Sequence, residues 1–113
     1  VTGGRLDHTF ANIQMLKFLA EQGVDAVIVD KTTQIRVVKD TSFTLPAMEN
    51  SYFSVFSLDE KCTGVSETGG KYELSDVELT NSFPIGVSNE FCGRPVTISV
   101  KKGSLLVITT GKD

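Results

Sequence analysis

The stretch PVTISVKKGSLLVITT, residues 95–110, decides the fold of this chain. Its two halves, 95–100 and 104–109, are rich in Val, Ile and Leu, which favour strands. Lys102-Gly103 lies between them and is typical of a tight turn. The stretch therefore predicts two antiparallel strands joined as the clearest β-hairpin in the sequence.

The residues before this stretch show the same two-residue alternation. Gly69-Gly70, Asn81-Ser82 and Cys92-Gly93 supply turn chemistry between the apolar runs. The expected strands cover residues 34–39, 41–45, 52–57, 63–68, 71–74 and 77–80. Short strands at this spacing predict a mainly β chain in which residues 31–113 form a sandwich or barrel.

The first thirty residues have a different texture. Apolar residues recur there at steps of three and four, as on a helix that buries one face: Leu6, Phe10, Ile13, Leu16, Leu19 and Ala20. Asp7 is expected in the first turn or at the N-cap, and Gly23 just past the end of the helix. Residues 24–29 predict a strand buried on both faces, as in a parallel sheet. Residues 1–30 are therefore expected to be the end of an α/β domain, with an upstream portion before Val1.

Composition and charge exclude several classes of protein. A hydrophobic content of 40% and a charged content of 22% fit neither a disordered chain nor a fibre. The formal net charge is −3 and the basic residues are dispersed, so we expect no nucleic-acid partner. No apolar run approaches the ~20 residues that span a bilayer, so we expect no membrane partner. Cys62 and Cys92 are expected to be two buried or inert thiols in preference to a disulfide, and one His with two distant Cys does not predict zinc.

The first cluster of candidate site residues is GGRLDH, residues 3–8. Glycines before a helix let backbone N–H groups approach an anion, and Arg5 supplies a fork suited to phosphate. Asp7 could hold a metal ion, a cationic ring or a hydroxyl, and His8 could donate a hydrogen bond. A purely structural explanation is open too: a tight turn, a helix cap and a solvated arginine. His8 has no Ser or Cys arranged beside it for a nucleophilic triad.

The second cluster is GVSNEF, residues 86–91, with Tyr72 as a separate candidate. Ser88 and Asn89 both donate and accept hydrogen bonds, which suits the edge of a heteroaromatic ring. An exposed Tyr72 could stack on a flat or cationic ligand. The alternatives are a polar turn at residues 88–89 and an ordinary strand aromatic at residue 72.

Taken in order, several motifs resemble the bacterial thiamine pyrophosphokinases. They are GGRLDHT (3–9) with ANI (11–13), GKYEL (70–74), GVSNEF (86–91) and the closing VTISV (96–100). The resemblance covers essentially the whole chain. Two positions depart from the family pattern: Gly70 stands where an apolar residue is expected, and Pro84 lies just before the GVSNEF motif.

The resemblance implies a two-domain enzyme that transfers pyrophosphate from ATP to thiamine, giving thiamine diphosphate and AMP. The chain would carry the end of the α/β catalytic domain (1–30) and the β-sandwich that binds thiamine (31–113). Arg5, Asp7 and His8 would line the substrate and nucleotide site, with Asp7 orienting thiamine.

Ser88 and Asn89 would contact the thiamine pyrimidine, and Tyr72 would stack near it, reaching a partner subunit's site. The resemblance further implies a cytoplasmic homodimer that uses Mg²⁺. The acidic metal ligands would lie upstream, none of them in this chain, so the chain alone would be inactive.

Two other classes of function stay open on the sequence. The chain could be a stand-alone β-sandwich that binds a small molecule, or a dimerisation module without catalysis. A strand at residues 24–29 that needs parallel neighbours favours the enzyme.

Overall fold

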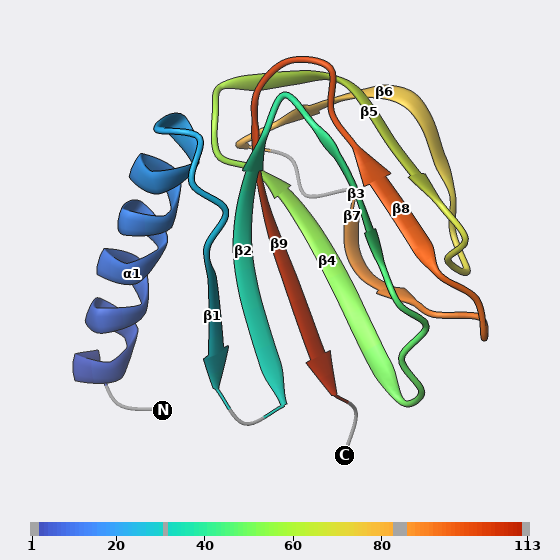
Figure 1. Ribbon diagram of the computed structural model, residues 1–113, viewed down its shortest axis with the longest axis horizontal. Helices are drawn as coiled ribbons and strands as arrows, with labels where there is room; N and C mark the ends of the chain where they lie inside the picture. The colour runs from blue at the N-terminus through green and yellow to red at the C-terminus, as the bar shows by residue number, and fades with distance from the viewer. Residues whose placement is uncertain (1–2, 31, 83–85, 112–113) are drawn as a thin grey trace.

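The computed structural model describes residues 3–30, 32–82 and 86–111, with side chains over 8–29, 32–82 and 89–111. Within these ranges one helix is followed by nine strands (Figure 1). Their bounds are α1 (Gly3–Glu21), β1 (Val27–Asp30), β2 (Thr33–Lys39), β3 (Ser42–Leu45), β4 (Ser51–Ser57), β5 (Lys61–Thr68), β6 (Leu74–Thr80), β7 (Gly86–Glu90), β8 (Val96–Ser99) and β9 (Ser104–Gly111).

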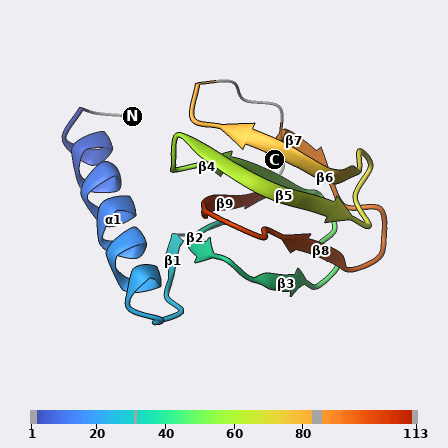
Figure 2. The ribbon, with the colours of Figure 1, turned by 90° about the horizontal axis from the view of Figure 1, so that it is seen from above.

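The strands form two antiparallel sheets that face each other. One sheet has five strands in the order β1-β2-β9-β4-β7, and the other has four in the order β3-β8-β5-β6. Seen from above, the two layers lie against each other and α1 stands beside them (Figure 2). The predicted fold class, a β-sandwich preceded by one helix and one strand, is confirmed.

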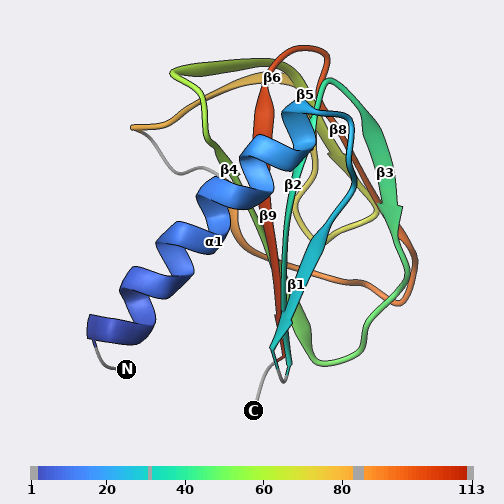
Figure 3. The same ribbon diagram turned by 60° about the vertical axis from the view of Figure 1, so that its left-hand side comes forward.

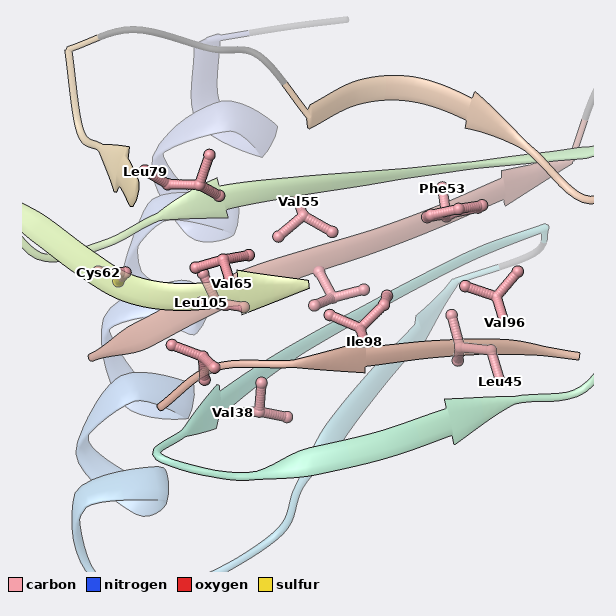
Figure 4. Packing of buried hydrophobic residues seen from close by; sticks show 12 residues of the cluster. Val38, Leu45, Phe53, Val55, Cys62, Val65, Leu79, Val96, Ile98 and Leu105 are labelled. Carbon is pink, nitrogen blue, oxygen red and sulfur yellow. The ribbon is translucent and has the colours of Figure 1, made fainter. Parts of the chain in front are cut away.

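Alternating residues from both layers fill the space between the sheets (Figure 4). Phe53 and Val55 come from β4 and Leu105 from β9, and they meet Val65 and Ile98 of the other sheet. Phe53, Val65, Ile98 and Leu105 are fully buried. Removing this much apolar surface from water is the main source of stability for such a layer.

The helix covers the outer face of the five-stranded sheet (Figure 3). Leu16 packs there on Val37 of β2 and Leu106 of β9. Because α1 covers one face and the second sheet covers the other, β9 is buried on both sides. This explains the unbroken apolar run at residues 105–108.

The C-terminus of α1 was predicted correctly. Gly23 has a φ of 79°, and its N–H donates to the Ala20 carbonyl at 3.1 Å. The N–H of Val24 donates to the Leu19 carbonyl at 2.9 Å. These are the two bonds of a Schellman cap, which needs a residue in the left-handed region.

The start of α1 differs from the prediction. The helix begins at Gly3, so both glycines are helical instead of forming a turn before it. Asp7 consequently lies inside the helix, and the first turn has no acidic residue. Phe10, expected on the buried face, is 62% exposed.

The prediction of a doubly buried parallel strand at residues 24–29 was wrong. The strand is β1, and it pairs antiparallel with β2, Val27 opposite Arg36. It is an edge strand of the five-stranded sheet, and Val27 and Val29 are 44% and 62% exposed. Because β2 follows β1 directly in the sequence, the two strands pair with each other as antiparallel neighbours, and β1 needs no parallel neighbour.

The predicted hairpin at residues 95–110 was also wrong, although both strands exist. β8 pairs with β3 and β5, whereas β9 pairs with β2 and β4, so the two strands belong to different sheets. Between them, the N–H of Thr63 donates to the Lys102 carbonyl at 2.9 Å. Gly103, with a φ of 123°, makes the corner because a Cβ there would lie 2.5 Å from Cys62 Sγ.

The secondary structure of two segments differs from what their sequence suggests. Residues 71–73 form a loop, not the start of a strand at 71–74, and β6 begins at Leu74. The GVSNEF motif, for which a turn was an open explanation, contains strand β7. β7 pairs with β4, with Asn89 opposite Phe53.

Candidate functional site

The side chain of Asn89 holds the loop that carries Tyr72. Its Oδ1 accepts the N–H of Tyr72 at 3.0 Å and that of Glu90 at 2.9 Å. Its Nδ2 donates to the Tyr72 carbonyl at 2.5 Å and to Glu67 Oε1 at 3.2 Å. A primary amide has two donor and two acceptor positions, and all four are used here. We call this arrangement of Asn89, Tyr72, Glu90 and Glu67 the Asn89 clasp.

Further backbone contacts fix the same loop to β7. The N–H of Lys71 donates to the Glu90 carbonyl at 2.8 Å, and Gly70 forms a β-bridge with Phe91. The ammonium of Lys71 lies 3.7 Å from the Glu90 carboxylate and 5.5 Å from the centre of the Tyr72 ring. The loop is therefore held in place mainly through its backbone.

Tyr72 itself points away from the core. Its side chain is 61% exposed, although both of its backbone polar groups are bonded to Asn89. A fixed backbone with an exposed ring is the arrangement in which an aromatic group can stack on a planar or cationic ligand.

Gly70 is explained by the clasp. A Cβ on this residue would lie 2.8 Å from Phe53 Cζ and 3.2 Å from Asn89 Oδ1. The glycine, which departs from the pattern expected in the sequence analysis, lets the loop approach Phe53 and Asn89 closely. A larger apolar residue would have to displace one of them.

Glu67 is a further member of this region, although it belongs to none of the motifs that predicted the site. The side chain is 1% exposed, and its Oε2 has no hydrogen-bond partner in the described part of the chain. Burial raises the pKa of the Glu67 carboxyl to about 7, and the hydrogen bond from Asn89 lowers it by less. Its position two residues after Val65, on the same inward face of β5, was the available sequence signal.

The second group of predicted residues lies at the N-terminal half of α1. A cleft of about 520 Å³ opens between α1 and the β1–β2 pair. Its lining residues are His8, Thr9, Asn12, Ile28, Val29, Thr33 and Ile35. The cleft combines an apolar floor with a few polar groups, as binding sites do. Asn12 joins the predicted His8 here.

Three predicted residues have side chains outside the described residues. Arg5 and Asp7 are placed only as backbone positions in α1, upstream of His8. Ser88 is placed only as a backbone position in β7, next to Asn89.

The structure does not bring the two predicted groups together. The cleft includes residues of β1 and β2, whereas the Asn89 clasp is built on β7. β1 and β7 are the opposite edges of the five-stranded sheet. Four strand spacings of about 4.8 Å separate these edges by roughly 19 Å.

Neither metal-binding clusters nor disulfides were found among the described side chains. Over residues 8–29, 32–82 and 89–111, no three His, Cys, Asp or Glu side chains gather where they could hold a metal ion. Both cysteines are free, with Cys62 buried and Cys92 exposed. In the same ranges, no helix is long and apolar enough to cross a membrane.

Comparison with known proteins identifies the family. Residues 32–105, more than half of the chain, match the model of the thiamin pyrophosphokinase vitamin B1 binding domain. A thiamine pyrophosphokinase of Bacillus subtilis is 30% identical over 109 residues, which is 96% of this chain and 51% of that protein.

Solved structures agree with this match. The crystal structure of thiamine pyrophosphokinase from Bacillus subtilis superposes with a TM-score of 0.89 and 29% identity, covering 98% of this chain and 52% of that one. That of the Geobacillus thermodenitrificans enzyme gives 0.85 and 28%, covering 99% and 52%. The chain spans about half the length of these relatives. It belongs to the thiamine pyrophosphokinase family and carries the vitamin B1 binding domain of that family.

Proposed function

We propose that this chain is the thiamine-binding, C-terminal part of a thiamine diphosphokinase. That transferase moves the pyrophosphoryl group of ATP to the hydroxyl of thiamine and releases AMP. The observation that carries the proposal is the match of residues 32–105, a span that contains the whole Asn89 clasp. Because the chain spans about half of its relatives, we assign the transferase activity to a longer protein. Residues 1–30 would be the end of its catalytic domain, and 31–113 its thiamine-binding domain.

At the β7 edge, Tyr72 would provide the surface on which thiamine stacks. Its exposed ring on a fixed loop supports this role, since thiamine is planar and cationic. Ser88 would contact the pyrimidine from β7. Direct contact with Asn89 would require the exchange of one of its four internal bonds, so Asn89 serves the site first by holding Tyr72.

At the α1 end, Arg5 and Asp7 would act on ATP and thiamine. A guanidinium neutralises phosphate oxygens, and a carboxylate attracts the thiamine cation and orients its hydroxyl for in-line attack on the β-phosphorus. His8 supports the assignment by lining the adjacent cleft.

The metal is assigned elsewhere. In such a reaction Mg²⁺ neutralises the triphosphate and its developing charge. Among the described side chains, no group of acidic, His or Cys residues is placed to hold this ion. We propose that the ligands belong to the other half of the longer protein.

We also propose that the protein works as a cytoplasmic homodimer. The separation of roughly 19 Å between the β1 and β7 edges of the sheet supports this, because two copies could bring the β7 edge of one to the α1 end of the other. Each complete site would then use both subunits.

Isothermal titration calorimetry with thiamine and with ATP tests the proposal, on this chain and on the longer protein. We expect the longer protein to bind thiamine, Y72A to weaken that binding and Y72F, which keeps the ring, to retain it. Asp7→Asn should lower turnover in the longer protein. Absence of thiamine binding by the longer protein would overturn the proposal. Thiamine binding by a longer protein without transferase activity would favour the alternative, a binding or dimerisation module.

A further inference from the structure

Glu67 combines features that ordinary core residues do not have. It lies on β5 between two apolar cross-strand neighbours, Leu74 on β6 and Ile98 on β8. One carboxyl oxygen accepts from Asn89, and the other has no partner in the described ranges. A buried polar atom without a hydrogen bond is costly, so a carboxyl group kept at such a place calls for an explanation.

The side chain of Asn89 donates a hydrogen bond to Glu67. An amide can be turned by 180°, which exchanges its donors and acceptors. Glu67 Oε1 accepts from the NH₂ side of the amide. It therefore supports the orientation in which Oδ1 faces the N–H of Tyr72 and Nδ2 faces the Tyr72 carbonyl, which the backbone groups of Tyr72 and Glu90 also require.

We propose that Glu67 is the positioning residue of the thiamine site, that it fixes the Asn89 clasp and hence Tyr72, and that loss of its proton loosens the clasp. This inference rests on the proposed function. It goes beyond it by naming a buried carboxyl, remote from any ligand contact, that controls the recognition loop.

The loosening follows from solvation. A protonated carboxyl is neutral and can stay among apolar neighbours. A carboxylate at the same place carries a charge whose second oxygen has no donor, so water must reach it. The N–H of Gly69 donates to Glu73, and the bonds of Asn89 hold the following residues. Because Asn89 connects Glu67 to this segment, water that reaches Oε2 would disturb the bonds that hold it.

Nearby charged groups already have partners of their own. The pairs on the surrounding elements are Lys71 with Glu90, Lys61 with Glu78, Lys101 with Asp76, Glu73 with the Gly69 N–H and Arg94 with the Gly69 carbonyl. β8 has no charged residue, and the titratable residue of β4 is Tyr52. Burial raises the pKa of Glu67 and the hydrogen bond from Asn89 lowers it, so the pH at which Glu67 titrates depends on whether the Asn89 clasp is closed.

Nuclear magnetic resonance of the ¹⁵N-labelled chain without thiamine tests the clasp. The Asn89 side-chain amide and the Tyr72 backbone amide are followed from pH 5.5 to 8.5. We expect both to move with a midpoint near neutral pH in the wild type and in the control E49Q, which alters an exposed carboxylate. In E67Q, a neutral mimic of the protonated group, they should stay near their low-pH positions. Resonances that do not move in the wild type, or that move equally in E67Q, overturn the inference. The wild-type result decides even if E67Q does not fold.

Thiamine affinity of the longer protein then separates the two proposals. Affinity should fall several-fold between pH 6 and pH 8.5 in the wild type and E49Q, with that fall removed in E67Q. Other titrating groups affect all three proteins alike. An Asn89 titration without thiamine binding at any pH refutes the proposed function and leaves the clasp assignment standing. Thiamine binding with the same pH profile in E67Q as in the wild type overturns the role of Glu67.

Discussion

The buried carboxyl of Glu67 should make the stability of the protein fall as the pH rises towards neutrality. Folding raises its pKa from 4.5 to about 7. Between these values the folded protein keeps a proton that the unfolded chain has lost. Raising the pH therefore favours unfolding in this window, and the contribution is fully present below pH 4.5 and lost once the pH passes about 7.

The magnitude follows from the shift. Each pKa unit corresponds to about 1.4 kcal/mol, so the raised pKa of Glu67 is equivalent to about 3 kcal/mol of unfolding free energy between pH 4.5 and 8. For a domain of this size, that amounts to roughly 12 °C in Tm. Glu67→Gln has no such proton, so its stability relative to the wild type should rise by about 3 kcal/mol over the window.

Urea unfolding followed by circular dichroism at pH 4.5, 5.5, 6.5, 7.5 and 8.5 measures the difference. Subtracting the two curves removes every other titrating group, and E49Q checks that removing an exposed carboxylate has no such effect. A Glu67→Gln advantage that stays constant within ~0.5 kcal/mol across the series would refute the reasoning.

Three further predictions use the corner, the thiols and the loop. Gly103→Ala should lower the unfolding free energy by about 3 kcal/mol, because the new Cβ would lie 2.5 Å from Cys62 Sγ. Gly23→Ala, which has open space around it, should lower it by only about 1 kcal/mol. Equal losses for the two variants in urea unfolding would contradict this reasoning. A thiol reagent should modify the exposed Cys92 rapidly and the buried Cys62 only when the protein unfolds. A rapid reaction that persists in the C92S variant would contradict the burial of Cys62. Tyr72→Ala should change the unfolding free energy by less than ~0.5 kcal/mol yet weaken thiamine binding by about fivefold in calorimetry, since the ring is 61% exposed.

Most strands could be predicted from sequence because a strand that buries one face alternates polar and apolar residues, and β9, buried on both faces, has a continuous apolar run. Sheet membership could not. The turn chemistry of Lys102-Gly103 suits a hairpin and a corner between two sheets equally well, and only the tertiary pairing of β8 and β9 with other strands distinguishes them. The apolar run 24–29 was misinterpreted for a related reason, because an exposed edge strand beside a helix has the same local composition as a buried parallel one.

The candidate site was predicted as a set of residues, but not as an arrangement. Asn89 and Tyr72 were singled out by residue type and resemblance, yet their bond spans seventeen positions of the chain. Glu67 was missed because an acidic residue in an alternating strand is usually solvated. The partner of a buried polar group depends on tertiary structure, which a local pattern does not contain.

The distance between the two site groups also constrains what the chain can do by itself. The cleft beside His8 lies at the β1 edge of the five-stranded sheet and the loop of Tyr72 is held at the β7 edge, and the four strand spacings between these edges span roughly 19 Å. A rigid sheet cannot close such a gap, because that would break the ladders between β2, β9 and β4. A molecule the size of thiamine can therefore touch only one of the two groups in a single copy. If both groups act on the same substrate, a second protein surface must complete each site, and dilution below the dimerisation range should abolish turnover of the longer protein while the Asn89 clasp stays intact.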